Sequence, residues 1–121
     1  IQDPYAYYGV NPNFTIRRIP CVDLFPLFSA DGIGARIAFY IQMISYVLMM
    51  AVFALFTQAD VYYSRYEMLL AVLSWLKPQK SLAYEAHLFS PSARGANLQR
   101  RVIDNVGSVI AITPKLRDDL I

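Results

Sequence analysis

Residues 37–59 read IAFYIQMISYVLMMAVFALFTQA, a run of 23 residues that contains no Asp, Glu, Lys, Arg or His. A helix rises about 1.5 Å per residue and the hydrocarbon core of a bilayer is about 30 Å thick, so about 20 apolar residues are enough to cross it. Within lipid, a single segment satisfies its backbone hydrogen bonds only as a helix. The run therefore predicts one transmembrane helix over about residues 35–59.

The region compatible with a helix is longer than this run. Between Gly34 and Pro78 the sequence contains neither Gly nor Pro, which leaves the 43 residues 35–77. We favour one helix that includes the membrane span 37–59 and continues to residue 77, because Lys77 and Pro78 predict a helix end there. The alternative is a reversal near residues 58–60 followed by a second, shorter apolar helix over 61–76. A reversal without Gly, Pro or Asn is weakly indicated.

The two flanks predict little regular structure. Four prolines interrupt residues 1–34, which also carry six aromatic side chains, so we expect an extended arm that lies on a partner. In residues 78–121 we expect loops, a short helix at 96–106 and, at 108–113, either a strand added to another protein's sheet or a buried loop. The expected fold is a mainly α membrane protein with an extended arm (1–34), a long helix (35–77) and an irregular tail (78–121).

One side of the predicted membrane helix carries small and polar residues. They are spaced by 4, 4 and 3 positions and therefore share a face: Gly34, Ala38, Gln42 and Ser45. Small residues allow a second helix to approach closely, and an amide or hydroxyl within a membrane is costly without a hydrogen-bonding neighbour. We expect this face to dock on another membrane subunit.

Aromatic residues flank the predicted span at both ends. Tyrosine and tryptophan favour the boundary between hydrocarbon and headgroups, where the ring is apolar and its polar atom meets water. We expect such an interfacial belt to consist of Tyr40 at one end and Tyr62, Tyr63, Tyr66 and Trp75 at the other.

The ionisable residues argue against several functions. The net charge of +2 is small and the strongest basic pairs are isolated doublets, so we expect no nucleic-acid binding. Cys21 and His87 are each the only residue of their type, so the chain alone builds neither a disulfide nor a histidine-pair metal site. On a helix, Glu85 and His87 would point apart. We therefore predict no catalytic residues, no enzyme activity, no metal and no cofactor, with structural lipids as the only bound molecules.

These patterns favour a structural role. We expect a non-catalytic accessory (supernumerary) single-pass subunit that scaffolds a large energy-transducing complex, with the lipid bilayer and the other subunits as its partners. The mitochondrial inner membrane, with its respiratory chain and ATP synthase, is preferred to the thylakoid. The alternative is a pigment- or electron-transfer-associated small subunit of a photosystem-type complex, with His87, Gln42 or Glu67 as ligands. A third hypothesis is a fragment of a larger polytopic transporter.

Overall fold

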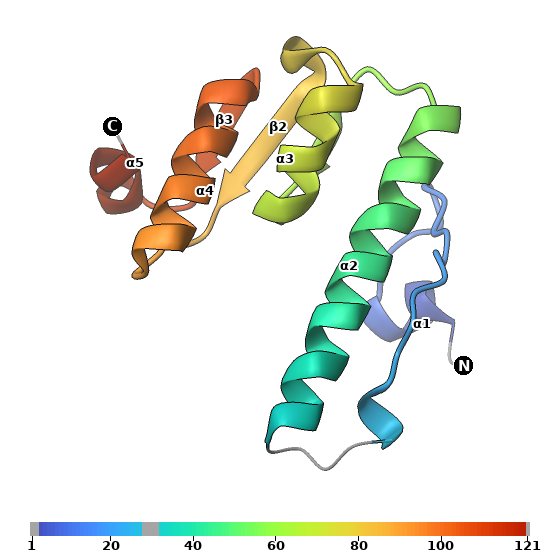
Figure 1. The fold of residues 1–121 in the computed structure, drawn as a ribbon. Helices are drawn as coiled ribbons and strands as arrows, with labels where there is room; N and C mark the ends of the chain where they lie inside the picture. The colour runs from blue at the N-terminus through green and yellow to red at the C-terminus, as the bar shows by residue number, and fades with distance from the viewer. Residues whose placement is uncertain (1–2, 28–31, 121) are drawn as a thin grey trace.

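The computed structural model describes residues 3–27 and 32–120 and is about 57% helical. Its elements are arranged in this order along the chain: α1 (Pro4–Tyr8), η1 (Phe25–Leu27), α2 (Ile33–Phe56), β1 (Tyr62–Ser64), α3 (Glu67–Leu76), η2 (Gln79–Ser81), β2 (Leu82–Ala86), α4 (Ala93–Asn105), β3 (Ser108–Ala111) and α5 (Pro114–Leu120). Figure 1 shows α2 as the longest helix, with α3, α4, α5, β2 and β3 on the side of its C-terminal half and η1 near its N-terminal end.

Helix α2 confirms the prediction of one helix with the length and composition of a membrane span. It has 24 residues, and its most apolar stretch has a mean hydropathy of 2.0. Its buried residues are mostly small: Ala38, Val47, Ala51 and Ala54. Most of its large apolar side chains are exposed.

The predicted continuation of this helix to residue 77 is wrong. Helix α2 ends at Phe56 because Thr57 has an extended backbone (φ −112°, ψ 130°) and its hydroxyl donates to the carbonyl of Phe53. The carbonyl of Thr57 accepts hydrogen bonds from the Tyr62 hydroxyl (2.6 Å) and from Lys77 Nζ (3.1 Å). These contacts join the end of α2 to the end of a separate helix, α3, so the alternative of a reversal followed by a second helix describes the chain better.

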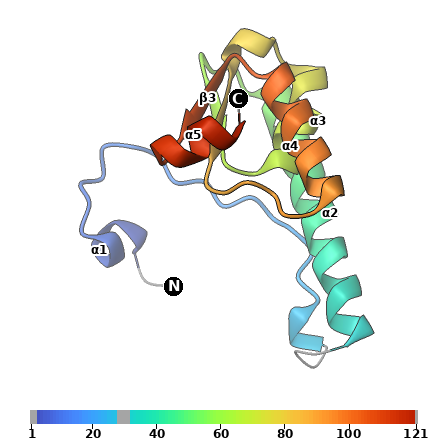
Figure 2. The same cartoon turned by 90° about the vertical axis from the view of Figure 1, so that its left-hand side faces the viewer.

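The predicted irregular tail is also wrong, because the described part of the chain contains a sheet of three parallel strands. The strand order is β1-β2-β3, with Tyr62 beside Leu82 and Tyr84 beside Val109. Helices α3 and α4 are the crossovers between successive strands, and Figure 2 shows α2, α3 and α4 on one side of the sheet. Strand β3 thus pairs with the chain's own β2. Its β-branched Val109 and Ile110 favour extended structure.

The core lies between this sheet and its helices. Leu82, Tyr84 and Ala86 alternate along β2 and are buried with leucines of α3 and with Val102 of α4. The short helix predicted at 96–106 is confirmed as α4, whose first turn is capped because Ser92 Oγ accepts from the backbone N–H of Gly95 (3.1 Å). Parallel strands bury such near-continuous apolar runs because helices cover them.

The predicted arm over residues 1–34 extends into the undescribed residues 1–2 and 28–31. Within its described part, α1 (Pro4–Tyr8) has proline at its first position and is capped by Gly9, which has a left-handed backbone conformation (φ 62°). Residues 10–24 contain no helix or strand and are mostly exposed. The later part of this segment contacts α2: the Arg17 guanidinium lies 5.9 Å from the centre of the Phe53 ring, and the backbone N–H of Val22 donates to Ser45 Oγ (2.9 Å).

Candidate ligand-binding site

The parallel topology places the carboxyl ends of all three strands at one edge of the sheet. Residues 65–66 come after β1, residues 87–92 after β2 and residues 112–113 after β3. In open α/β sheets, ligands bind outside this edge, because the loops that leave it carry side chains and backbone groups from several strands. The carboxyl edge is therefore where a ligand site is sought first.

A hollow of about 560 Å³ lies where this edge meets α2 and the arm. The arm, α2 and the end of β1 all contribute to its lining, which consists of Cys21, Phe39, Gln42, Met43, Tyr46, Ser64, Arg65 and Tyr66. Five of these eight side chains are apolar or weakly polar, and Arg65 is the one charged residue among the described lining residues. Apolar walls with a few polar groups are typical of small-molecule sites.

The turn that holds Arg65 is ordered by its neighbours. Ser64 Oγ accepts from the backbone N–H of Tyr66 (2.9 Å), and Tyr66 in turn is the N-cap of α3. The Tyr66 ring lies 6.0 Å from the ring of Tyr46 on α2. Burial, and to a smaller extent the nearby Tyr46, raises the pKa of Tyr66. Arg65 itself is exposed and has no carboxylate within ion-pair distance among the described residues, so its guanidinium is available to an anion.

A buried polar network supports the loop after β2. The Tyr84 hydroxyl donates to Glu67 Oε1 (2.7 Å) and accepts from Gln99 Nε2 (3.0 Å). Gln99 also donates to the carbonyl of Leu88 (2.8 Å) and accepts from the N–H of Ser90 (3.2 Å). Burial, followed by the hydrogen bond to Glu67, raises the pKa of Tyr84 to about 12. The network therefore joins α3, β2, α4 and the loop.

Glu85 and His87 form a pair, contrary to the sequence-based expectation. That expectation assumed a helix, but Glu85 lies in β2, where residues i and i+2 point to the same face. His87 Nε2 is hydrogen-bonded to Glu85 Oε1. The pair lies on the face opposite Tyr84. Within the described part of the chain, no three His, Cys, Asp or Glu side chains come close enough to hold a metal ion.

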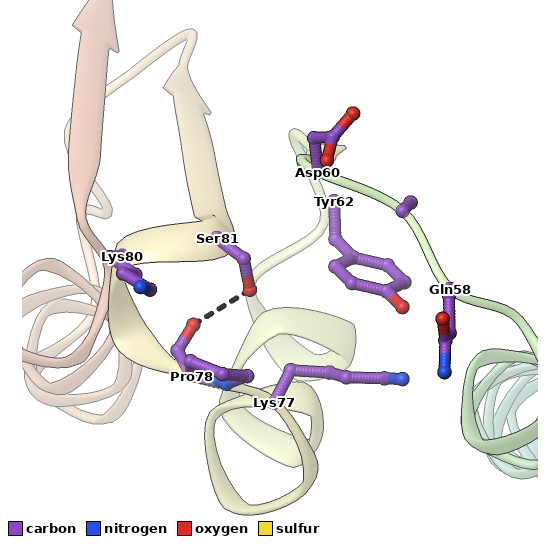
Figure 3. Close-up of a pocket in the computed structure, with 8 residues that line it drawn as sticks. Gln58, Asp60, Tyr62, Lys77, Pro78, Lys80 and Ser81 are labelled. Carbon is purple, nitrogen blue, oxygen red and sulfur yellow. Dashed lines mark hydrogen bonds between the residues drawn. The ribbon is translucent and has the colours of Figure 1, made fainter.

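A second hollow, of about 470 Å³, lies at the opposite, amino edge of the sheet. Figure 3 shows the Lys77 side chain reaching toward Gln58 and passing below the Tyr62 ring, while Ser81 donates to the carbonyl of Pro78 (2.8 Å). Lys77 Nζ is already bonded to the carbonyl of Thr57 and lies 4.9 Å from the centre of the Tyr62 ring. This cation therefore stabilises the reversal after α2.

The structure places the predicted docking face of α2 against the chain's own arm. Ala38 is fully buried, and Gly34, Gln42 and Ser45 are half-buried. Ser45 Oγ accepts from Val22 and donates to the carbonyl of Gln42 (2.9 Å). Docking on another subunit stays a prediction for the remainder of this face.

The residues of the predicted interfacial belt lie at different levels of the fold. Tyr62 and Trp75 are at the amino edge of the sheet and Tyr66 is at the carboxyl edge, while Tyr40 and Tyr63 are more than half exposed. Trp75 is 72% exposed, and the Arg101 guanidinium lies 5.5 Å from the centre of its ring. The reversal after Phe56 separates these residues, because β1 returns along α2 before α3 begins.

Sequence reasoning did not single out Arg65 as a site residue. Its signal is the order YYSRYE, in which a short β-favouring segment passes directly into a helix with Glu67 in the first turn. A strand followed by a short turn and a helix marks the carboxyl edge of a parallel sheet. The apolar run at residues 37–59, which precedes this segment, favours a continuous helix instead.

No family model matches the chain, and no match is found among curated proteins or solved structures. A fold alone does not determine a function, which depends on the geometry and chemistry of the site.

Proposed function

We propose that the chain is a membrane-associated α/β unit that binds an amphiphilic ligand with an anionic group. The observation that carries the proposal is the hollow at the carboxyl end of β1, where the exposed Arg65 faces apolar side chains of α2. A planar guanidinium suits a phosphate or carboxylate, to which it donates two parallel hydrogen bonds. Phe39, Met43 and Tyr46 suit an apolar portion of the same ligand.

Two further features support ligand binding at this edge. The unit β1-α3-β2-α4-β3 consists of parallel strands joined by helices, and open α/β sheets bind their ligands outside the carboxyl ends of the strands. Within the hollow itself, the turn that carries Arg65 is held by the hydrogen bond from the Tyr66 backbone N–H to Ser64 Oγ (2.9 Å). A preorganised site loses less entropy when the ligand binds. The proposal assigns binding and no chemical reaction.

Titration calorimetry with hexyl phosphate tests this function on the full chain in a neutral detergent. We expect Arg65→Gln to raise the Kd at least about tenfold, since a lost charge-assisted hydrogen bond contributes about 1.5–3 kcal/mol. Arg94→Gln is the matched control, because Arg94 is an exposed arginine of α4 that does not line the hollow. The proposal would be contradicted if Arg65→Gln bound hexyl phosphate with the same Kd as the unchanged chain. It would also be contradicted if the unchanged chain bound uncharged hexanol as tightly as hexyl phosphate.

The accessory-subunit hypothesis is a second candidate, supported by the exposed aromatic residues of the arm. Tyr7, Tyr8 and Phe14 are each more than half exposed, and an aromatic segment of this kind suits a protein surface. Purification of the native assembly in mild detergent tests it. Stoichiometric co-purification of energy-transducing subunits is the expected result, and a chain that purifies alone would oppose it.

A further inference from the structure

The outward face of α2 is a continuous apolar stripe. Its members are spaced by 4, 3, 4, 4 and 3 residues, are between 37% and 58% exposed, and are named here the outer stripe: Ile37, Ile41, Ile44, Leu48, Val52 and Leu55. This spacing puts all six on one side of the helix. An uninterrupted apolar face of this length far exceeds the scattered apolar residues of a typical protein surface.

The polar residues of α2 contact the rest of the chain, and Ser45, four residues after Ile41 and three before Leu48, lies at the edge of the outer stripe that the arm covers. Ser45 bonds to the arm, and Gln42 lines the hollow beside Arg65. The buried positions are occupied mainly by alanine. A helix on the surface of a water-soluble protein has the reverse arrangement, with large apolar residues inside and polar residues outside. Small residues at the packed face and large apolar residues outside are the pattern of a helix that meets lipid.

The α/β unit limits how α2 can meet that lipid. Tyr46, Met50 and Ala54 pack against the core of the unit, so the C-terminal half of the helix lies beside α3. Residues 33–45 remain, and 13 residues at about 1.5 Å each give about 20 Å, less than the roughly 30 Å of a hydrocarbon core. A perpendicular helix would also carry Arg65 and Glu67, near Tyr46, into the hydrocarbon, where each charge costs several kcal/mol.

We propose that α2 lies in the plane of one leaflet, with the outer stripe among the acyl chains and the arm and α/β unit on the water side. The occupant of the stripe is thus lipid hydrocarbon, which fits a helix without Asp, Glu, Lys, Arg or His between positions 37 and 56. Tyr46 and Met50, which contact the α/β unit, are on the side of the helix opposite Leu48 and Val52. This orientation deepens the proposed membrane association and rests on it.

Nitroxide depth measurements test the orientation in phosphatidylcholine vesicles that contain the full chain. In a Cys21→Ser background, Ile37→Cys, Ile44→Cys and Leu55→Cys are labelled singly, and collision rates with oxygen and with a nickel chelate report depth. An in-plane helix predicts three equal, shallow depths of about 5–10 Å. Arg94→Cys is the water-side control. If the label at position 44 is deep and the labels at 37 and 55 are shallow, the helix spans the membrane and the proposal is overturned. If the nickel chelate reaches all three labels as readily as the label at position 94, the outer stripe lies outside lipid and the proposal is likewise overturned.

Labelling from outside sealed vesicles gives an independent result. Arg36→Cys and Asp60→Cys flank the apolar run, and an in-plane helix exposes both to an impermeant maleimide from the same side. Protection of only one flank in the same vesicle population would contradict the inference. Failure of the chain to float with vesicles would overturn the membrane association itself, whereas binding with a spanning label pattern would overturn the in-plane orientation alone. Circular dichroism confirms that each variant keeps its helices.

Discussion

The side-chain amide of Gln99 donates to the hydroxyl of Tyr84 across 3.0 Å, and this bond joins α4 to the central strand β2. Both residues are 1% exposed, so if one of them is replaced by an apolar residue, water does not reach the other to take over its hydrogen bond. The same amide fixes the loop after β2 through Leu88 and Ser90. One polar side chain in the core thus joins α4 and β2 to the loop at the carboxyl edge of the sheet.

Gln99→Leu should lower the free energy of unfolding by about 2 kcal/mol, because the carbonyl of Leu88 and the N–H of Ser90 both lose their partner. Denaturant unfolding followed by circular dichroism measures the change. Gln79→Leu is the control, since Gln79 is an exposed residue whose amide also donates to two carbonyls, those of Asp104 and Val106, and the bond to Asp104 is exposed to water. Equal losses for both variants would show that burial of the network contributes nothing.

Stability should fall as the pH rises from about 10 to about 12. The pKa of Tyr84 is about 12 in the folded state and 10.0 is its ordinary value, so in this window the unfolded chain loses the proton first. The unfolded state then binds fewer protons than the folded state, and the free energy of unfolding decreases with pH. The raised pKa of Tyr66 acts in the same direction. Denaturant unfolding at several pH values between 8 and 11.5 measures the free energy of unfolding, which should decrease less steeply with pH in Tyr84→Phe than in the unchanged chain. An equal slope in both chains would contradict the raised pKa of Tyr84.

Gly107→Ala should destabilise the fold by about 1–3 kcal/mol, because a Cβ there would lie 2.8 Å from the carbonyl oxygen of Gln79 and from Lys80 Cα. These are backbone atoms that move only if η2 moves. Gly95→Ala is the comparison: its Cβ would approach the Ser90 hydroxyl oxygen, which can rotate away. In thermal unfolding, Gly107→Ala should have a lower midpoint temperature than Gly95→Ala. The opposite order would argue against close packing of η2 on residue 107.

Ser45→Ala should release the arm from α2, because the Val22 N–H loses its acceptor. Limited trypsin digestion checks this, since Arg17 and Arg18 lie in the exposed arm, and we expect cleavage there to accelerate several-fold. Ser74→Ala is the matched control: Ser74 makes the same kind of bond to its own helix, at Ala71, and none to the arm. If cleavage rates match the control, the arm is held by other contacts, among them Arg17 over the Phe53 ring (5.9 Å).

The sequence by itself determined the elements whose causes are local. The charge-free apolar run specifies a helix with the length of a membrane span, Lys77 and Pro78 end α3, and the polar segment after Ser92 forms α4. Each depends on propensity, capping or composition within a few residues. The order YYSRYE indicates the turn that carries Arg65, but it does not indicate the hollow, because the lining comes from residues as far apart as Cys21 and Tyr66.

Only the tertiary structure decided where α2 ends and which elements come after it. Thr57 is compatible with a longer helix, but its carbonyl is bonded by Tyr62 and by Lys77, which is 20 residues away in the chain. The strands have three to five residues and gain their hydrogen bonds from strands about 20 or more positions distant. A short segment adopts β structure because a partner strand satisfies its backbone groups, and that partner becomes adjacent only when the helices pack.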